Sequence, residues 1–185
     1  MSALAQAPTS LPQLVTEFLS SAIHLILFSR RLYPEETFER RRLFDVQVYR
    51  SRHPELAEYI SFAVRGVQEM LQRGEADALV LLIHAPAIVG SGAAAPGRVV
   101  EKFVFELAAA AGDAPPDVDL APLRAQLRGF LLKLHVCEAL LSPLPCEPHE
   151  LSFTLEIHSQ ACRAPPSRLP REALTLRVAL CTARR

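Results

Sequence analysis

Residues 17–34 read EFLSSAIHLILFSRRLYP, and this stretch decides the fold because it contains the most apolar run of the chain, residues 22–28. From Leu11 onward, apolar residues recur every three or four positions, and others fill the remaining sides. The pattern predicts a buried central helix that ends before Tyr33 and Pro34, since the residue before a proline disfavours helical backbone. The run is shorter than the roughly 20 residues of a membrane span, so we expect no membrane partner.

Two more helices and five strands are predicted around this helix. One helix begins at Pro54 and is closed by Gly74, and the other is capped by Asp117 or Asp119 and ends before Pro143. After a basic turn, alternating or continuous apolar runs predict strands within residues 44–49, 78–83, 99–107, 151–158 and 172–181. The order contains no repeat and no regular strand–helix alternation. We therefore expect an α+β fold, with helices packed on one side of a mostly antiparallel sheet.

Composition bounds the domain count and the partners. The chain has 185 residues, 50% of them hydrophobic, which fits one domain. We expect a disordered tail over residues 1–10 and the domain over residues 11–185. Lysine plus arginine and aspartate plus glutamate number 20 each, so no net charge attracts a phosphate backbone and no direct nucleic-acid partner is expected. The four cysteines form no CxxC pair, which favours reduced thiols in the cytosol or nucleus.

Two motifs hint at cofactor chemistry. Residues 90–97 read GSGAAAPG, but they lead into a predicted strand, whereas a phosphate loop opens a helix. Cys146 and His149 lie close together, with His158 and Cys162 further along, yet this spacing fits no common zinc pattern. We expect no cofactor, no metal and no enzymatic activity. A nucleotide- or zinc-dependent enzyme is the alternative.

We predict that the charged side chains lie on solvated faces and that two histidines lie in the core. Glu101 and Glu106 alternate with phenylalanines and predict a solvated strand face. His24 and His135 fall within apolar helix faces, where hydrogen-bonded core histidines are expected. The concentrated positive charge is interpreted as a solvated face, with an acidic partner or a phosphate backbone as the alternative; it comprises Arg30, Arg31, Arg40, Arg41 and Arg42.

Four stretches carry a resemblance to a known family. They lie in the same order and at similar separations as in that family. They are EFLSSAIHLILFSRRLYP (17–34), HPELAEYI (53–60), RVVEKFVFE (98–106), and QLRGFLLKLHVCEALL (126–141) followed by SFTLEIHS. Together they resemble the HORMA-domain family, and within it the Mad-like, non-catalytic accessory subunit of translesion DNA polymerase zeta.

The resemblance implies a HORMA fold in which a C-terminal segment closes over a bound peptide like a seatbelt. The peptide would add as a strand to the sheet. Tyr33 and Tyr59 match family tyrosines that line the peptide channel, and we expect Phe153 and Leu155 to complete the site. The alternative is that the two tyrosines are ordinary packing residues at helix ends.

The same resemblance implies partners for an adaptor in translesion synthesis and double-strand-break repair, with links to the cell cycle. They are a peptide motif of the polymerase zeta catalytic subunit, a scaffold translesion polymerase, subunits of a break-protection complex and a remodelling ATPase. The expected location is the nucleus, and also the cytoplasm. A spindle or cell-cycle checkpoint adaptor is the alternative.

A dimerisation surface is also implied. Arg128, Lys133 and Ala139 match the helix surface through which related HORMA domains form homodimers or heterodimers, with Arg40 nearby. Arg31 stands where the family has an acidic residue, so a charge pair expected at that surface becomes a repulsion.

The C-terminal region departs from the family. Residues 159–185 form a shorter segment than the family's seatbelt, and the chain contains no tryptophan to pack on a trapped peptide. We therefore expect a shortened seatbelt. The alternative is a diverged or truncated HORMA domain that does not trap peptides stably.

Overall fold

The computed structural model describes residues 10–86, 97–107, 119–147, 150–159 and 176–182. Its three long helices are α1 (Leu11–Ser29), α2 (Pro54–Gln72) and α3 (Ala121–Leu140). A short 3-10 turn, η1, spans Glu35–Thr37. The strands are β1 (Phe38–Leu43), β2 (Val46–Ser51), β3 (Ala76–Ala85), β4 (Arg98–Leu107), β5 (Ser152–Ser159) and β6 (Leu176–Thr182).

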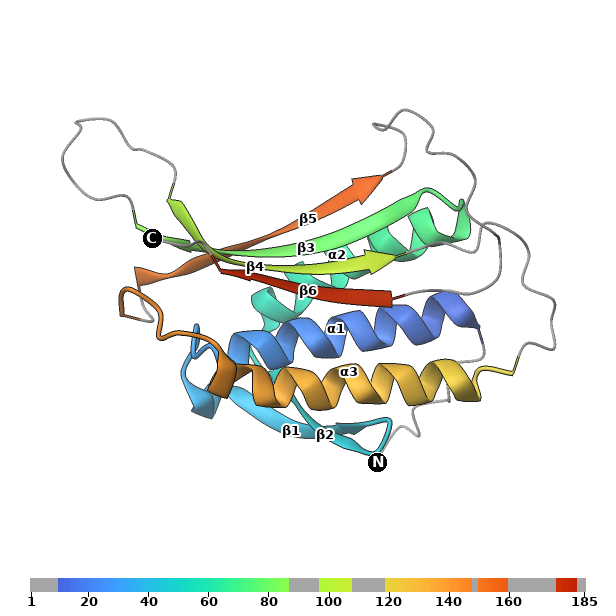
Figure 1. Cartoon of the computed structure of the whole chain (residues 1–185), viewed down its shortest axis with the longest axis horizontal. Coiled ribbons are helices and arrows are strands. Elements are labelled where there is room, and N and C mark those ends of the chain that lie inside the picture. The colour runs from blue at the N-terminus through green and yellow to red at the C-terminus, as the bar shows by residue number, and fades with distance from the viewer. Residues whose placement is uncertain (1–9, 87–96, 108–118, 148–149, 160–175, 183–185) are drawn as a thin grey trace.

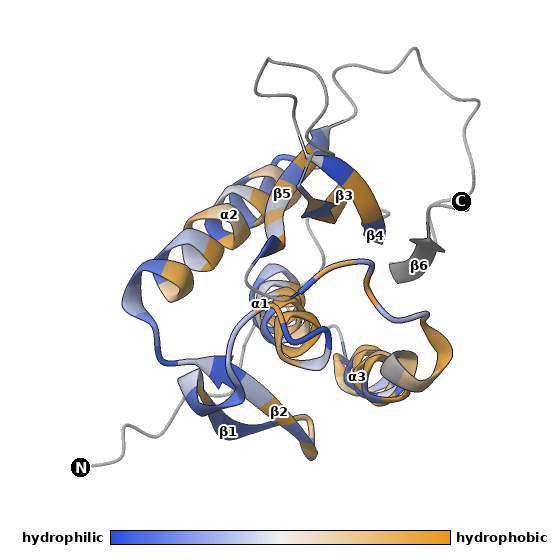
Figure 2. Ribbon diagram, turned by 90° about the vertical axis from the view of Figure 1, so that its left-hand side faces the viewer, coloured by the Kyte–Doolittle hydropathy of each residue, from blue (hydrophilic) through white to orange (hydrophobic). Residues whose placement is uncertain are grey.

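The elements form layers around α1 (Figure 1). Four antiparallel strands make a sheet in the order β5-β3-β4-β6, and β1 and β2 form a separate antiparallel hairpin. In Figure 2, α1 lies in the middle with α2 and α3 on either side, the sheet on one side and the hairpin on the other. The expected α+β fold, with helices on one face of an antiparallel sheet, is confirmed.

Helix α1 is the centre of the core. Ser10 caps its first turn by accepting a hydrogen bond from the backbone N–H of Gln13 at 3.4 Å. Twelve of its 19 residues are buried. By length and composition alone α1 resembles a membrane span, but it packs against α2, α3 and β2. We therefore describe it as a core helix. It ends at Ser29, with Arg30 as its C-cap, and Arg31 then adopts a left-handed conformation with φ of 54°.

Helix α2 begins and ends where the sequence predicts, whereas α3 begins at Ala121, one residue later than an Asp119 cap would give. Gly74, at φ of 70°, follows α2, and its N–H and that of Glu75 bond to the carbonyls of Leu71 and Met70. These two bonds form a Schellman motif, which requires the left-handed residue. At the start of α3, Asp119 Oδ1 accepts from the N–H of Ala121 at 2.9 Å. Asp117 lies outside the described residues.

The predicted basic turn before the first strand is wrong, because residues 38–43 form strand β1. Its pairing with β2 aligns Arg40 with Tyr49 and Leu43 with Val46. Phe44 and Asp45 connect the strands at φ of 48° and 61°. A two-residue hairpin turn of this kind usually contains Asn-Gly or Asp-Gly. Phe-Asp gives no such signal, which is why the sequence did not reveal the hairpin.

The sheet turns one face to the helices. Alternate residues of β3, including Leu79, Leu81 and Ile83, join the main core. The others, Ala78, Val80 and Leu82, form a smaller buried cluster on the opposite face. Both faces of β3 are therefore buried, as expected for its continuous apolar sequence. This strand pairs with β5, which lies at the edge of the sheet.

Candidate functional site

Strand β5 lies at one end of the sheet and carries the candidate site. It pairs with β3, while β6 pairs with β4 at the opposite end. Within the described ranges no strand pairs with the outer edge of β5, and a strand edge of this kind can bind another chain. Half-buried side chains at Phe153, Leu155 and Ile157 face the helices, and the residues between them are exposed.

Tyr59, in the second turn of α2, reaches the backbone of this edge strand. The N–H of Leu155 donates a hydrogen bond to the Tyr59 hydroxyl at 3.2 Å. The Leu155 amide therefore points away from β3 and toward the open edge. Successive residues of an antiparallel strand direct their amides to opposite sides, so residues two apart share a side. Phe153 and Ile157 therefore also present their amides to that edge.

An aromatic cluster supports this hydrogen bond. The rings of Tyr33 and Tyr59 both pack edge-on against Phe153, with centroids 6.4 and 5.7 Å away. Burial raises the pKa of Tyr33 above its usual value, so its hydroxyl stays protonated at neutral pH. The structure thus brings together the four residues predicted for peptide binding. Their binding role itself stays a prediction.

Phe62 is an exposed aromatic residue on α2 that the sequence reasoning did not single out. It lies three positions after Tyr59 on α2, and 72% of it is exposed, against 43% of Tyr59. One turn further, Gly66 approaches the strand so closely that an added Cβ would lie 3.1 Å from Ile157 Cδ1. Phe62 falls outside the apolar stripe of α2. A large aromatic residue on the polar side of a helix was the signal available in the sequence.

The residues predicted for dimerisation lie on the molecular surface. Arg128, Lys133 and Ala139 are exposed on α3, and Arg31 and Arg40 are exposed after α1 and on β1. Lys133 Nζ lies 5.5 Å from the centre of the Phe130 ring. The same helix carries three exposed apolar residues spaced four apart, namely Leu132, Val136 and Leu140. Their role in association stays a prediction.

Two charge predictions are wrong, because Arg30 and Glu101 form a buried ion pair. Arg30 donates from Nε to Glu101 Oε2 at 2.9 Å and from a terminal nitrogen to Oε1 at 2.6 Å. The same nitrogen donates to the carbonyl of Ser142 at 2.8 Å. Both side chains are only 6% exposed. Desolvation raises the pKa of Glu101, and the Arg30 guanidinium opposes that shift.

Register explains the burial of Glu101. It lies on the same side of β4 as Phe103 and Phe105, which are buried, while the alternate residue Glu106 is exposed as predicted. Arg30 follows α1 and Ser142 follows α3, so the ion pair joins two helix ends to the sheet. The ion pair therefore has a structural role, because its two charged groups already bind each other.

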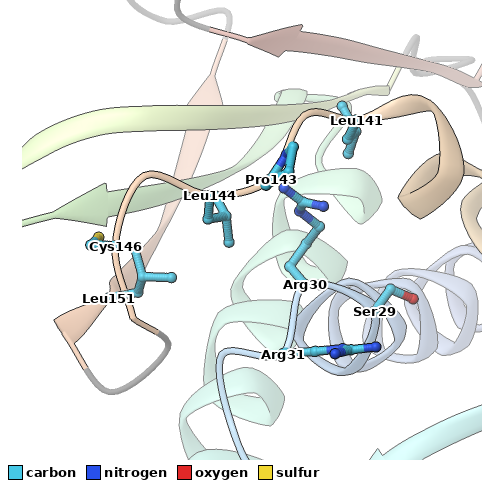
Figure 3. Close-up of a pocket in the computed structure, with 8 residues that line it drawn as sticks. All are labelled: Ser29, Arg30, Arg31, Leu141, Pro143, Leu144, Cys146 and Leu151. Atoms are coloured by element: carbon cyan, nitrogen blue, oxygen red, sulfur yellow. The ribbon is translucent and has the colours of Figure 1, made fainter.

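A cavity of about 360 Å³ is lined in part by Arg30 of this ion pair (Figure 3). The end of α1 and the segment after α3 line it, with Ser29, Arg30, Arg31, Leu141, Pro143, Leu144, Cys146 and Leu151 as its walls. Its buried cation is already bound to Glu101. The described residues hold no group of three or more His, Cys, Asp or Glu side chains suited to a metal. His149 and Cys162, and most of the glycine-rich loop, lie outside them.

The two helical histidines differ. His24 is 2% exposed, and its Nδ1 accepts from the N–H of Ser51 at 3.4 Å, so the predicted core histidine is confirmed. Desolvation, and then the nearby charge of Arg50, lowers its pKa to about 4. The prediction for His135 is wrong. It is exposed on α3, and its Nε2 lies 2.6 Å from the carbonyl of Gln47 on β2.

Comparison with known proteins identifies the family. The HORMA domain profile matches residues 12–162. The chain belongs to the HORMA domain family. It is 34% identical over 154 residues to "Mitotic spindle assembly checkpoint protein MAD2B" from Homo sapiens, covering 78% of this chain and 63% of that protein. It is 33% identical over 131 residues to the "DNA polymerase zeta processivity subunit" of Arabidopsis thaliana, covering 71% and 56%. The matched region thus spans less than two thirds of either relative.

Solved structures show the same fold at low identity. A chain from the "Crystal Structure of Mitotic Checkpoint Complex" matches with a TM-score of 0.65 and 20% identity, covering 88% of this chain and 84% of that one. A chain from the "Structure of C. elegans HTP-2 bound to HIM-3 closure motif" matches with a TM-score of 0.58 and 13% identity, covering 89% and 74%. The resemblance to the Mad-like polymerase zeta subunit is confirmed, and the relatives' names point to a family of non-catalytic adaptors.

Proposed function

We propose that this chain is a non-catalytic HORMA adaptor that binds a partner peptide by adding it as a strand to the outer edge of β5. The hydrogen bond from Leu155 to the Tyr59 hydroxyl supports the proposal, because it directs alternate β5 amides toward an open edge. Exposed Tyr59 and Phe62 supply an apolar surface beside that edge. Main-chain bonds would give affinity, and these side chains would give selectivity.

The placement of β6 supports the same proposal. This strand pairs with β4 from Glu101 to Leu107, at the end of the sheet opposite to β5. The C-terminal strand therefore leaves the β5 edge open to a peptide. Residues 160–175 connect the two strands and lie outside the described residues. We propose that residues 159–185 act as the seatbelt segment.

The relatives' names suggest the partners. One is named as a polymerase zeta processivity subunit, and others as spindle checkpoint proteins. We propose that the chain binds a peptide of the polymerase zeta catalytic subunit and bridges it to a scaffold polymerase in translesion synthesis. Further proposed partners are break-protection complex subunits in double-strand-break repair and a remodelling ATPase. The proposed location is the nucleus, with a cytoplasmic pool.

A direct binding measurement tests this function. The probe is a labelled peptide spanning the subunit-binding segment of a polymerase zeta catalytic subunit, titrated with the chain and followed by fluorescence anisotropy. Tyr59→Ala should weaken binding by about 2 kcal/mol, which is typical of a central interface aromatic. Glu58→Ala is the matched control, since Glu58 is exposed on the neighbouring position of α2. Absence of binding by the unaltered chain would disprove the proposal.

The dissociation rate separates trapping from simple strand addition. A closed seatbelt should give a slowly released fraction of peptide after dilution into unlabelled competitor. Rapid release of all bound peptide would support the alternative of a HORMA domain without stable trapping. Binding of spindle checkpoint peptides in preference to polymerase peptides would support the checkpoint alternative.

A second candidate function is association with another HORMA domain through α3. Leu132, Val136 and Leu140 are 48%, 57% and 82% exposed and lie on successive turns, beside Arg128 and Lys133. Such an apolar stripe favours a protein contact. Light scattering should show a dimer of this chain, or a complex with a related HORMA domain, that Val136→Glu abolishes. A monomer that binds no HORMA domain would contradict the proposal.

A further inference from the structure

The hydroxyl of Tyr59 lies at the middle of the open β5 edge and has hydrogen-bonding capacity to spare. A phenol carries one donor as well as acceptor lone pairs. Its oxygen accepts from the N–H of Leu155 at 3.2 Å. Among the described residues, none accepts the Tyr59 proton. That proton is therefore available to a ligand at the edge.

The position of Tyr59 conflicts with an uninterrupted ladder between β5 and an added strand. In such a ladder a peptide carbonyl would bind the amide of Leu155 directly, and the Tyr59 hydroxyl already holds that amide. The Tyr59 side chain is held in position, because its ring packs on the Phe153 ring with the two centroids 5.7 Å apart. Phe153 is held from another side by Tyr33.

We propose that Tyr59 stays in place and becomes part of the interface. Its hydroxyl keeps the bond from Leu155 and donates its proton to a carbonyl of the peptide. Direct bonds then form only at the flanking amides of Phe153 and Ile157. This inference rests on the proposed function and specifies how the same edge recognises its ligand.

The arrangement defines the class of peptide. An oxygen inserted between the Leu155 N–H and a carbonyl spreads the two backbones there by up to roughly 3 Å, the length of one further hydrogen bond. The peptide therefore bows outward opposite Leu155. Directly paired residues share one face of a sheet, so the side chain at the bow points to the α2 side, toward Tyr59 and exposed Phe62. The ligand is an extended peptide with an apolar residue at this position.

Amide proton shifts test the inference directly. The unaltered chain, labelled with nitrogen-15, is titrated with the polymerase zeta catalytic-subunit peptide described above. The amide protons of Phe153 and Ile157 should move strongly downfield as they gain carbonyl acceptors. The Leu155 amide should move little, because it keeps its acceptor. A Leu155 shift as large as those of its neighbours would overturn the inference, since it would mean that the peptide displaces Tyr59.

Binding by two phenylalanine variants gives a second test. Tyr59→Phe should weaken the peptide by about 5-fold, the effect of one net hydrogen bond. Tyr49→Phe, which removes the hydroxyl of the tyrosine on β2 and lies outside the predicted peptide site, should stay within about 2-fold of the unaltered chain. Equal or tighter binding by Tyr59→Phe overturns this inference alone. Failure of the unaltered chain to bind overturns the proposed function as well.

Discussion

Two side chains join a helix to the sheet, and they do so in opposite ways. Arg30, after α1, holds Glu101 of β4 in a buried ion pair with side chains 6% exposed. Tyr59, on α2, holds the backbone of Leu155 on β5 and is 43% exposed. In the first contact both charged groups are buried, and each is hydrogen-bonded to the other. The second lies at the edge of the sheet, and no described residue accepts the Tyr59 proton. We therefore assign stability to the first contact and recognition to the second.

Breaking the ion pair should have the largest effect on the molecule. Arg30→Met leaves the Glu101 carboxylate buried without its partner, which typically costs about 3–5 kcal/mol. Urea denaturation gives the change in unfolding free energy. Arg42→Met is the matched control, because Arg42 pairs with Asp45 at 3.2 Å on the surface, with side chains about three quarters exposed.

A double variant keeps this prediction testable if the single one does not fold. Arg30→Met combined with Glu101→Leu removes both charges and should recover most of the lost free energy. The assignment of stability to this ion pair would be wrong if Arg30→Met were as stable as Arg42→Met.

Acid should weaken the core through His24. Its folded pKa of about 4 lies below the ordinary 6.5, so the unfolded chain binds the proton more readily. The stabilisation is present above pH 6.5 and is lost as the pH falls toward 4, by roughly 3 kcal/mol in total. His24→Asn keeps an acceptor for the Ser51 amide without this titration. Denaturation curves at several pH values should show a flatter acid limb for the variant, and parallel limbs would refute the assignment.

The histidines also show how far the sequence predicted the fold. Periodicity located the three helices and most strands, since apolar spacing reports which face is buried. It placed His24 in the core correctly and His135 wrongly, because α3 is covered on one side only. It placed Glu101 in solvent, although that residue shares its side of β4 with Phe103. Glu101 is buried with a charged partner, Arg30, that lies 71 residues away in the sequence. The spacing of residues within one strand gives no information about such a distant partner.

Sequence periodicity predicted less of the candidate site than of the fold. Tyr33 and Tyr59 were selected by family resemblance, since nothing in the spacing distinguishes them from packing residues. The bond between Tyr59 and Leu155 spans 96 positions and depends on how α2 lies against β5. The structure therefore supplied the feature on which the proposed recognition rests, and it added Phe62.

Phe62 should separate binding from stability. Phe62→Ser removes an aromatic ring that is 72% exposed, so the unfolding free energy should change by no more than about 0.5 kcal/mol. Peptide binding should weaken by roughly 1 kcal/mol, because the ring borders the proposed channel. Leu140→Ser, at an 82% exposed position on α3, is the control and should bind the peptide normally. A loss of stability in Phe62→Ser without a loss of binding would contradict the prediction.

The smallest effect should come from Tyr59→Phe on folding, and it sharpens the contrast with Arg30. Both changes remove the hydrogen bonds of one side chain. At the open edge, however, water can replace the hydroxyl at the Leu155 amide, so the unfolding free energy should fall by only about 0.5 kcal/mol. Hydrogen exchange should be faster at Leu155 and unchanged at Val80, in the middle of β3. A stability loss comparable to that of Arg30→Met would mean that Tyr59 is a structural lock, and its assignment to recognition would then fail.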